Sequence, residues 1–360
     1  MRGGKYLGEG TYGCTLDPAP KCMGPEESVL GDGTSTVSDL RRKAKVGKVF
    51  VQNKYVTDEW SVAQEIAAID PKQLYFIYPI ARCPTTPSAV RKAEGSGSCT
   101  NMSRIHANKR ARGKLEMVLL PNGGVPLNTF VMSNKVAPSH MLRSLLPVFK
   151  GIQKLAKHNI VHHDMKFDNI LYNAANDECR IIDFGLKVPM ADALKPRENR
   201  YMFSNYWLHP PEYRMIVSMY QRQWKPLDEQ DIRQFMTQHL GVYKIHFNSR
   251  DRHTLADLIF NGKVFAYCDY ERAYILYLKH VSKQKGANAM LSAMQRHPEK
   301  IDVFSLGITL VYLSMYLDFA QDPPAFEHKF FQLIRSMLHP DPRHRASPTK
   351  CIRDVMSMLR

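Results

Sequence analysis

The chain has 360 residues, and 44% of them are hydrophobic, enough to form a sizeable core in two lobes or in one large domain with insertions. Lysine and arginine number 50 against 34 aspartates and glutamates, and this net charge of +16 favours acidic partners, namely nucleotides, acidic proteins, nucleic acids or anionic membranes. The most apolar stretch, 301–317, contains Asp302 and Ser305 and is shorter than the ~20 residues of a membrane span, so we expect a buried helix there.

Seven cysteines are scattered along the chain, an odd number without a Cys-x-x-Cys pair. This spacing argues against a zinc site or a disulfide scaffold and predicts an intracellular, reducing compartment. A loop with functional character begins as early as Gly8, so we expect no secretory signal peptide. The cysteines are Cys14, Cys22, Cys83, Cys99, Cys179, Cys268 and Cys351.

A glycine-rich pattern, Gly-x-Gly-x-x-Gly, is formed near the N-terminus by Gly8, Gly10 and Gly13, with Glu9 inside it. Glycine lets the backbone approach phosphates closely and adopt positive φ, so this is a candidate nucleotide loop. A dinucleotide-binding fold would continue into a helix, but two prolines follow within the next seven or so residues and exclude one. The sequence therefore predicts a strand, a loop and a second strand.

The next segment, 17–44, is rich in Pro, Gly, Ser and Thr and is expected to be a loop insertion. The alternating run Lys-Val-Gly-Lys-Val-Phe-Val at 45–51 then predicts a strand. Lys48 is the leading candidate on this strand for binding phosphates, and Lys45 is the alternative. Without the acidic residues further along the chain, a surface lysine would be the better interpretation of either.

Helical spacing of apolar residues predicts a helix over 58–69. Two glutamates on it, Glu59 and Glu65, are candidates to hold a lysine. Glu59 lies nearer the apolar stripe, which should face inward, so we expect it to be the partner of Lys48 and Glu65 to be a solvated charge.

Beyond this helix, the apolar run 74–80 predicts a strand, and the polar stretch 84–113 predicts an exposed insertion. The insertion is basic, but it lacks the aromatic residues that stack on bases, so we favour a solvated loop over a nucleic-acid site. A buried strand is expected at 115–120, and an amphipathic helix at 139–158.

The segment 160–185 contains the densest set of chemical groups. Two apolar runs on either side of a polar turn predict a hairpin. Asp164, Lys166 and Asn169 precede the first run and Asp183 ends the second, so the hairpin should bring these groups together. Oxygen atoms of Asn169 and Asp183 suit Mg²⁺, Asp164 can accept a hydroxyl proton, and Lys166 can neutralise a migrating phosphoryl group. The pattern favours phosphoryl transfer over a merely polar, capped hairpin.

The run His-His-Asp-Met-Lys-Phe-Asp-Asn at 162–169, followed by Asp-Phe-Gly at 183–185, resembles the catalytic loop and metal-binding motif of protein kinases. His163 stands where most kinases have arginine. A lysine two residues after the aspartate, here Lys166 after Asp164, resembles the catalytic loop of serine/threonine kinases. The opening Gly-x-Gly-x-Tyr-Gly-Cys and the insertions also resemble kinases of large nucleocytoplasmic DNA viruses, for which the compartment would be the host cytoplasm or the virion.

This resemblance implies an α+β, two-lobed fold: a β-rich N-lobe over 1–120 and a mostly helical C-lobe over 121–360, with an insertion at about 217–298. It implies ATP and Mg²⁺ as cofactors, Asp164 and Lys166 as catalytic residues, and Asn169 and Asp183 as metal ligands. The backbone at Leu119 and Leu120 would face the adenine. The implied nucleotide-binding residues are Gly8, Glu9, Gly10, Gly13, Lys48, Glu59, Leu119, Leu120, Asn169 and Asp183.

Three further positions resemble kinase motifs late in the chain. Glu212 ends a Pro-Pro-Glu motif and is expected to pair with Arg345, while Asp302 is expected to brace the catalytic loop. The implied function is an ATP-dependent serine/threonine protein kinase with acidic or nucleic-acid-associated protein substrates. The alternatives are a catalytically weak kinase-like scaffold and a nucleic-acid-binding protein that uses its basic insertions; a scaffold usually lacks one of the catalytic groups, and all of them are present here.

Overall fold

The computed structural model describes residues 5–10, 13–29, 45–50, 52–94, 101, 115–195, 199, 206–221, 228–245 and 253–360. The chain divides into two compact units. Unit 1 consists of Met1–Gly124 with Ile182–Gly185, and unit 2 consists of Val125–Ile181 with Leu186–Arg360. The division differs from the expected one at residue 120 chiefly because Asp183 and its neighbours group with unit 1.

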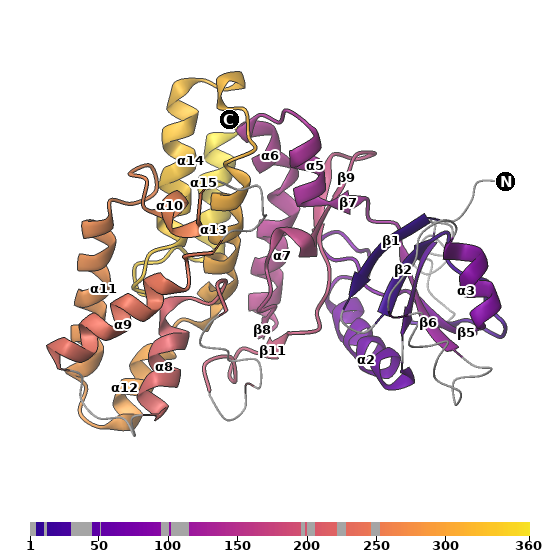
Figure 1. The fold of residues 1–360 in the computed structure, drawn as a ribbon, viewed down its shortest axis with the longest axis horizontal. Helices are drawn as coiled ribbons and strands as arrows, with labels where there is room; N and C mark the ends of the chain where they lie inside the picture. The colour runs from indigo at the N-terminus through magenta and orange to yellow at the C-terminus, as the bar shows by residue number, and fades with distance from the viewer. Residues whose placement is uncertain are drawn as a thin grey trace. The chain divides into compact units, whose positions relative to one another are not determined.

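Unit 1 is built on an antiparallel six-stranded sheet with the order β1-β2-β4-β6-β5-β3 (Figure 1). Alternating side chains are buried along β5, as period-two patterning requires. Two helices cover the sheet, α2 against β4 and β6, and α3 against β1 and β2. The elements are β1 Lys5–Gly10, β2 Gly13–Asp17, β3 Glu27–Ser28, β4 Lys45–Phe50, α2 Asn53–Ile69, β5 Ala81–Thr85, α3 Pro87–Glu94 and β6 Leu115–Pro121.

The expected strand over 74–80 is wrong, because β5 begins only at Ala81. The carboxylate of Asp70 explains the difference. It accepts hydrogen bonds from the backbone N–H groups of Leu74, Tyr75 and Phe76 at 3.0, 2.8 and 3.0 Å. These donors are therefore satisfied by a side chain and do not need a neighbouring strand.

Both expected loop insertions of unit 1 contain regular structure. Within 17–44 the short strand β3 pairs with β5, and within 84–113 the helix α3 occupies Pro87–Glu94. The residues 30–44, 95–100 and 102–114 lie outside the described part, so the remainder of these two predictions is not addressed by the structure.

The cysteine spacing argues against a disulfide scaffold, yet some of the cysteines are paired. Cys22 and Cys83 form a disulfide, and Cys14 is also disulfide-bonded, whereas Cys179, Cys268 and Cys351 are free. The bridge ties the chain before β3 to β5 across 61 residues of sequence. Cysteine spacing does not determine pairing, so the reducing compartment stays a prediction from the sequence.

Unit 2 is mostly helical (Figure 1). Its helix α13 is buried along its whole length and packs against α10 and α14, as the apolar run at 301–317 predicts. Its helices are α5 Leu127–Ser133, α6 Pro138–Ser144, α7 Leu146–Lys157, α8 Pro211–Gln221, α9 Glu229–Gly241, α10 Leu255–Ile259, α11 Tyr267–Ser282, α12 Ala287–Met294, α13 Ile301–Leu313, α14 Pro324–Met337 and α15 Pro348–Met358, with 3-10 turns η2 Phe167–Asn169, η3 Pro298–Lys300 and η4 Phe319–Gln321.

The single helix expected over 139–158 is two helices, α6 and α7. Pro147 lies in the first turn of α7, where a residue without an N–H group is tolerated. The same residue could not donate the hydrogen bond that would continue α6, so the first helix ends before it. The α+β composition, with a sheet-rich unit and a helical unit, is confirmed. Between 217 and 298 the described residues form the last turn of α8 and all of α9 to α12, consistent with the helical pattern of that segment.

The predicted hairpin at the centre of the chain is present in unit 2. Strand β9 (Ile170–Asn173) pairs antiparallel with β10 (Glu178–Ile181), and β9 also pairs with β7 (Val125–Pro126). A second small sheet joins β8 (Ile160–Val161) to β11 (Val188–Pro189). The loop between β8 and β9, residues 162–169, leads directly into the first strand of this hairpin, which fixes the end of the loop.

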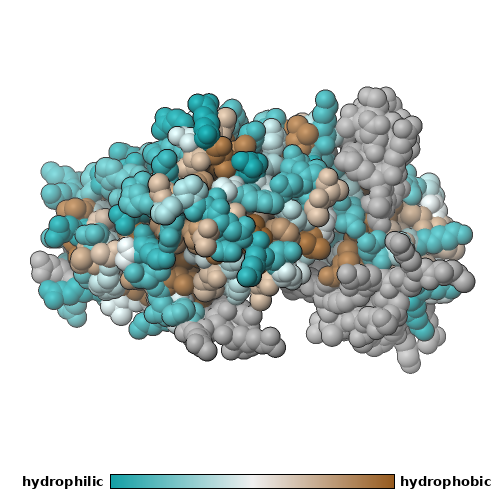
Figure 2. Space-filling model, turned by 90° about the horizontal axis from the view of Figure 1, so that it is seen from above, coloured by the Kyte–Doolittle hydropathy of each residue, from teal (hydrophilic) through white to brown (hydrophobic). Residues whose placement is uncertain are grey.

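No helix among the described residues is long and apolar enough to cross a membrane. Figure 2 shows a face on which hydrophilic residues predominate and hydrophobic ones are scattered. Large exposed hydrophobic side chains are dispersed along the sequence, for example Met23, Leu74 and Leu276.

Candidate active site

In unit 2, the loop between β8 and β9 fixes the carboxylate of Asp164, which is only 5% exposed. The side-chain amide of Asn169 donates to the backbone carbonyl of Asp164 at 2.9 Å and to its Oδ2 at 2.8 Å. The ammonium of Lys166 lies 3.1 Å from the same Oδ2. Three of the expected residues therefore converge, and two charge-assisted or amide donors contact one oxygen of the carboxylate.

The backbone of this loop is held from below by Asp302 at the N-terminus of α13. Its two carboxylate oxygens accept hydrogen bonds from the backbone N–H groups of His162 and His163 at 2.7 and 2.9 Å. Burial raises the pKa of Asp302, while His162 and these two donors act in the opposite direction. The bracing role expected of Asp302 is present in the structure.

His163 lies in the left-handed region, with φ of 74°, and is fully buried. Its Nε2 is 2.8 Å from the hydroxyl of Tyr213. Burial lowers the pKa of His163 to about 4, the charge of Asp164 opposing this shift and that of His162 adding to it. The imidazole is therefore neutral near pH 7, and its nitrogen contacts a tyrosine.

In unit 1, Lys48 on β4 forms an ion pair with Glu59 on α2. Its Nζ is 2.6 Å from Oε2 and 2.8 Å from Oε1 of Glu59. Burial opposes the charged ammonium, but the charges of Glu59 and Asp183 more than offset it, so the pKa of Lys48 is raised. The helical position of Glu59, rather than that of Glu65, provides the partner.

Asp183 groups with this pair in unit 1. It adopts φ of 62°, and its Oδ1 accepts the N–H of Gly185 at 3.3 Å. The next side chain, Phe184, is buried and meets Phe76 edge to face, with ring centroids 5.4 Å apart. This apolar anchor leaves the carboxylate of Asp183 exposed while its backbone is held.

The glycine-rich segment forms the hairpin of β1 and β2, the strand-loop-strand arrangement that the sequence predicts. Gly10 pairs with Gly13, Gly8 and Glu9 lie on β1, and the tip at 11–12 is outside the described residues. A Cβ on Gly13 would lie 2.3 Å from the carbonyl oxygen of Val49. Glycine at 13 is therefore required by the approach of β2 to β4, whatever a ligand adds.

Leu119 and Leu120 lie near the end of β6 and pair with Gly47 and Val46 on β4. The carbonyl of Leu119 accepts a hydrogen bond from the N–H of Ile80 at 2.8 Å. The sheet thus uses part of the backbone that the resemblance assigns to adenine binding.

The donor chemistry suits a magnesium nucleotide. Asp183 offers an exposed carboxylate, and Asn169, whose amide nitrogen is committed to Asp164, would bind a metal through its carboxamide oxygen; both are hard ligands. Lys48 offers a cation for phosphate oxygens. Among the described residues there is no group of three or more His, Cys, Asp or Glu residues that could hold a metal ion without help from other ligands.

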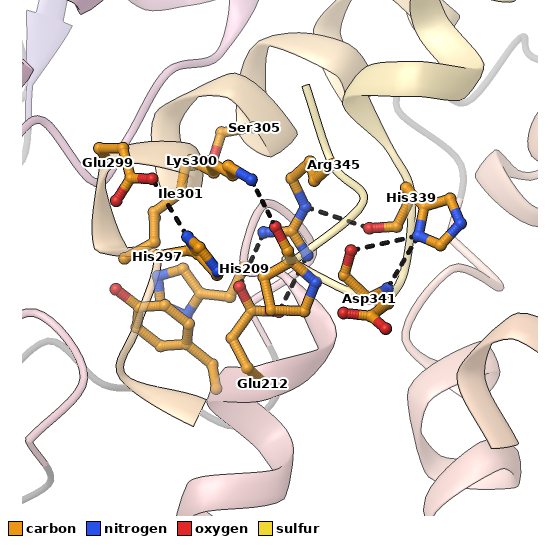
Figure 3. A network of polar contacts seen from close by, with 12 residues as sticks. His209, Glu212, His297, Glu299, Lys300, Ile301, Ser305, His339, Asp341 and Arg345 are labelled. Atoms are coloured by element: carbon orange, nitrogen blue, oxygen red, sulfur yellow. Dashed lines mark hydrogen bonds and ion pairs between the residues drawn. The ribbon is translucent and has the colours of Figure 1, made fainter. Parts of the chain in front are cut away.

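Glu212 on α8 and Arg345, ahead of α15, form the expected pair. Their side chains are almost fully buried and make two hydrogen bonds of 2.7 and 2.9 Å, and Figure 3 shows them pointing toward one another. Arg345 also donates to the carbonyl of His339 at 3.1 Å. A bidentate pair of this kind fixes the end of the segment that begins after Gly185.

One contact of the loop between β8 and β9 had no signal in the sequence. The hydroxyl of Tyr206 donates a hydrogen bond to Oδ1 of Asp164. No motif spacing in the sequence relates Tyr206 to Asp164.

A protein kinase domain profile matches residues 98–213, which include the loop 162–169, Asp183 and Glu212. Human serine/threonine-protein kinase PINK1, mitochondrial, is 30% identical to this chain over 86 residues, covering 23% of this chain and 15% of that protein. The aligned part therefore spans a small fraction of the relative. With the sheet-rich and helical units, these similarities support a eukaryotic-type protein kinase fold.

Proposed function

We propose that this chain, whose fold is that of a eukaryotic-type protein kinase, transfers the γ-phosphate of ATP to serine or threonine hydroxyls of proteins. The observation that carries the proposal is the buried carboxylate of Asp164, held by Asn169 at 2.8 Å and beside Lys166 at 3.1 Å. A carboxylate so held has a fixed orientation, which a group that accepts a hydroxyl proton needs.

In the proposed reaction, Asp164 binds the acceptor hydroxyl and takes its proton as the oxygen attacks phosphorus. Lys166 offsets charge on the transferred group, and Lys48, fixed by Glu59, binds phosphate oxygens. Asn169 and Asp183 would hold Mg²⁺, which when bound neutralises phosphate charge.

Two features support protein hydroxyls of the serine/threonine class as acceptors. Lys166 lies beside Asp164, the arrangement of the serine/threonine form, and the partial relative is a serine/threonine-protein kinase. The net charge of +16 favours acidic or nucleic-acid-associated substrate proteins. Because the opening motif resembles that of kinases of large nucleocytoplasmic DNA viruses, the proposal includes a relationship to those kinases.

The test is to incubate the purified chain with γ-³²P-labelled ATP, Mg²⁺ and a set of acidic and basic acceptor proteins. We expect label in phosphoserine and phosphothreonine after acid hydrolysis, and its loss when a chelator removes Mg²⁺. Label confined to phosphotyrosine would contradict the acceptor class. Absence of label with every acceptor and in the chain itself would contradict the enzyme and favour a kinase-like scaffold.

A further inference from the structure

The carboxylate of Asp164 is held on both of its oxygens. Oδ2 receives Asn169 and Lys166, and Oδ1 receives the hydroxyl of Tyr206. We propose that Tyr206 is a positioning residue for Asp164, and that the helices between 217 and 298 hold it in place through Arg214, His239 and Tyr270. The inference extends the proposed kinase activity and gives those helices a role in it.

Arg214 on α8 joins the backbone of Tyr206 to the helical insertion. Its side chain is buried, and its Nη2 donates to the carbonyl of Tyr206 at 3.1 Å, while Nη1 donates to the carbonyl of His209 at 3.3 Å. The N–H of His209 in turn donates to the carbonyl of Tyr206 at 3.0 Å. One guanidinium therefore binds both ends of the turn that presents Tyr206.

His239 on α9 continues this chain of hydrogen bonds. Its Nδ1 is 2.7 Å from Nη1 of Arg214, and its Nε2 is 2.7 Å from the hydroxyl of Tyr270 on α11. Arginine only donates, so Nδ1 must be the accepting nitrogen and Nε2 must bear the proton. Burial, reinforced by the charges of Arg214 and Arg345, lowers the pKa of His239 well below its usual value and favours this neutral form.

Tyr270 differs from the neighbouring buried tyrosines of α11 in the hydrogen bonding of its hydroxyl. Tyr274 and Tyr277 are as fully buried as Tyr270, but their hydroxyls have no hydrogen-bond partner within the described ranges. The hydroxyl of Tyr270 is bonded to His239, whose other nitrogen is bonded to Arg214. Tyr274→Phe is therefore a matched control for Tyr270→Phe: the same helix, burial and chemical change, without the hydrogen bond.

Positioning, rather than obstruction, follows from the acceptor capacity of the carboxylate. Each carboxylate oxygen accepts about two hydrogen bonds. Oδ2 has two donors, whereas Tyr206 occupies one of the two lone pairs of Oδ1. The second lone pair of Oδ1 serves the substrate hydroxyl, while Tyr206 limits rotation of the carboxylate.

The first experiment measures kcat and the KM for ATP of the full chain and of three variants. Tyr206→Phe should lower kcat about tenfold, the scale of one hydrogen bond to a charged group, and leave the KM for ATP unchanged. Tyr270→Phe should lower kcat about threefold and Tyr274→Phe should leave it at the wild-type value. The double variant Tyr206→Phe/Tyr270→Phe should be no slower than Tyr206→Phe, because both changes act on one carboxylate.

An increase in kcat for Tyr206→Phe would show that Tyr206 obstructs Asp164 and would overturn the proposal. An unchanged kcat would also overturn it, because Tyr206 would then have no effect on Asp164. Equal effects of Tyr270→Phe and Tyr274→Phe, or full additivity in the double variant, would remove the role of the insertion.

A second readout does not depend on catalysis. Amide hydrogen exchange at His209, whose N–H bonds to Tyr206, should be faster in Tyr270→Phe than in the wild type and unchanged in Tyr274→Phe. Absence of phosphate transfer by the wild type would refute the proposed function, and the exchange result would still decide the bracing. Identical exchange in all three proteins would overturn it.

Discussion

The two groups of charged residues in the proposed mechanism differ in their access to water. In unit 1, the side chains of Lys48 and Glu59 are 22% and 24% exposed. In unit 2, Asp164 and Asp302 are 5% and 4% exposed. A half-buried ion pair can exchange partners when a ligand arrives, whereas a buried carboxylate that binds backbone N–H groups is part of the fold. We therefore expect the charged pair in unit 1 to contribute mainly to the proposed function, and the buried carboxylates in unit 2 to contribute to both that function and stability.

The largest effect that separates the two groups is expected from Asp302→Ala. It would leave the buried N–H groups of His162 and His163 without their acceptor, and each such loss costs about 2 kcal/mol, so the free energy of unfolding should fall by about 4 kcal/mol. Urea denaturation measures this loss.

The matched control is Asp228→Ala, which removes an exposed carboxylate that caps α9 through one N–H group. It should lower the free energy of unfolding by about 1 kcal/mol. Equal losses in the two variants would show that burial does not distinguish Asp302.

A pH dependence of stability is the next effect. The pKa of His163 is about 4 in the folded chain and about 6.5 when unfolded, so the unfolded state binds the proton first as the pH falls. Stability is therefore complete above about pH 6.5 and declines toward about pH 4, by about 3 kcal/mol from this residue. His163→Asn tolerates positive φ and does not titrate. The difference in unfolding free energy between wild type and variant should shrink by that amount, and a constant difference would contradict a neutral His163.

Glu59→Gln tests the partly exposed ion pair of Lys48 and Glu59 in unit 1. It should lower the free energy of unfolding by less than about 1 kcal/mol, because a partly exposed ion pair contributes little. Phosphate transfer should nevertheless fall more than in the control Glu65→Gln, since Glu59 is the residue that fixes Lys48. The reverse order of the two activities would assign the functional carboxylate to Glu65.

No effect is expected from removing phosphate between Gly185 and Glu212. A neutral imidazole bonded to Tyr213 cannot form the bidentate fork by which an arginine binds a phosphorylated residue. Phosphatase-treated enzyme should keep its activity, and His163→Arg should not raise it. A large loss of activity on dephosphorylation, traced to a phosphate on Tyr201, Ser204 or Tyr206, would reveal another cation that binds phosphate.

The parts of the site that the sequence could predict involve residues that are close in sequence or share a helix or strand period. The residues from Asp164 to Asn169 occupy one short loop, and a hairpin with β9 and β10 follows from the apolar pattern around it. Glu59 follows from helical periodicity, because only one face of α2 is apolar. The pairing of Glu212 with Arg345 came from motif resemblance, since the residues are distant in sequence.

The contacts that sequence did not predict lack such order. The run 74–80 is apolar enough for a strand, yet the Asp70 side chain binds its N–H groups. Cys22 and Cys83 are separated by 61 residues, and cysteine spacing does not determine pairing. The hydrogen bond from Tyr206 to Asp164, and those that link Arg214 through His239 to Tyr270, join side chains that share no sequence period.

The central claim is that the buried carboxylate of Asp164 performs chemistry while the groups of unit 1 bind the nucleotide. It is tested most directly by measuring phosphate transfer and ATP affinity together in Asp164→Asn. Transfer should fall by about a hundredfold or more, as loss of a proton acceptor predicts, while the Kd for Mg-ATP stays at its wild-type value. Near-normal turnover in this variant would contradict the account and remove Asp164 from the mechanism.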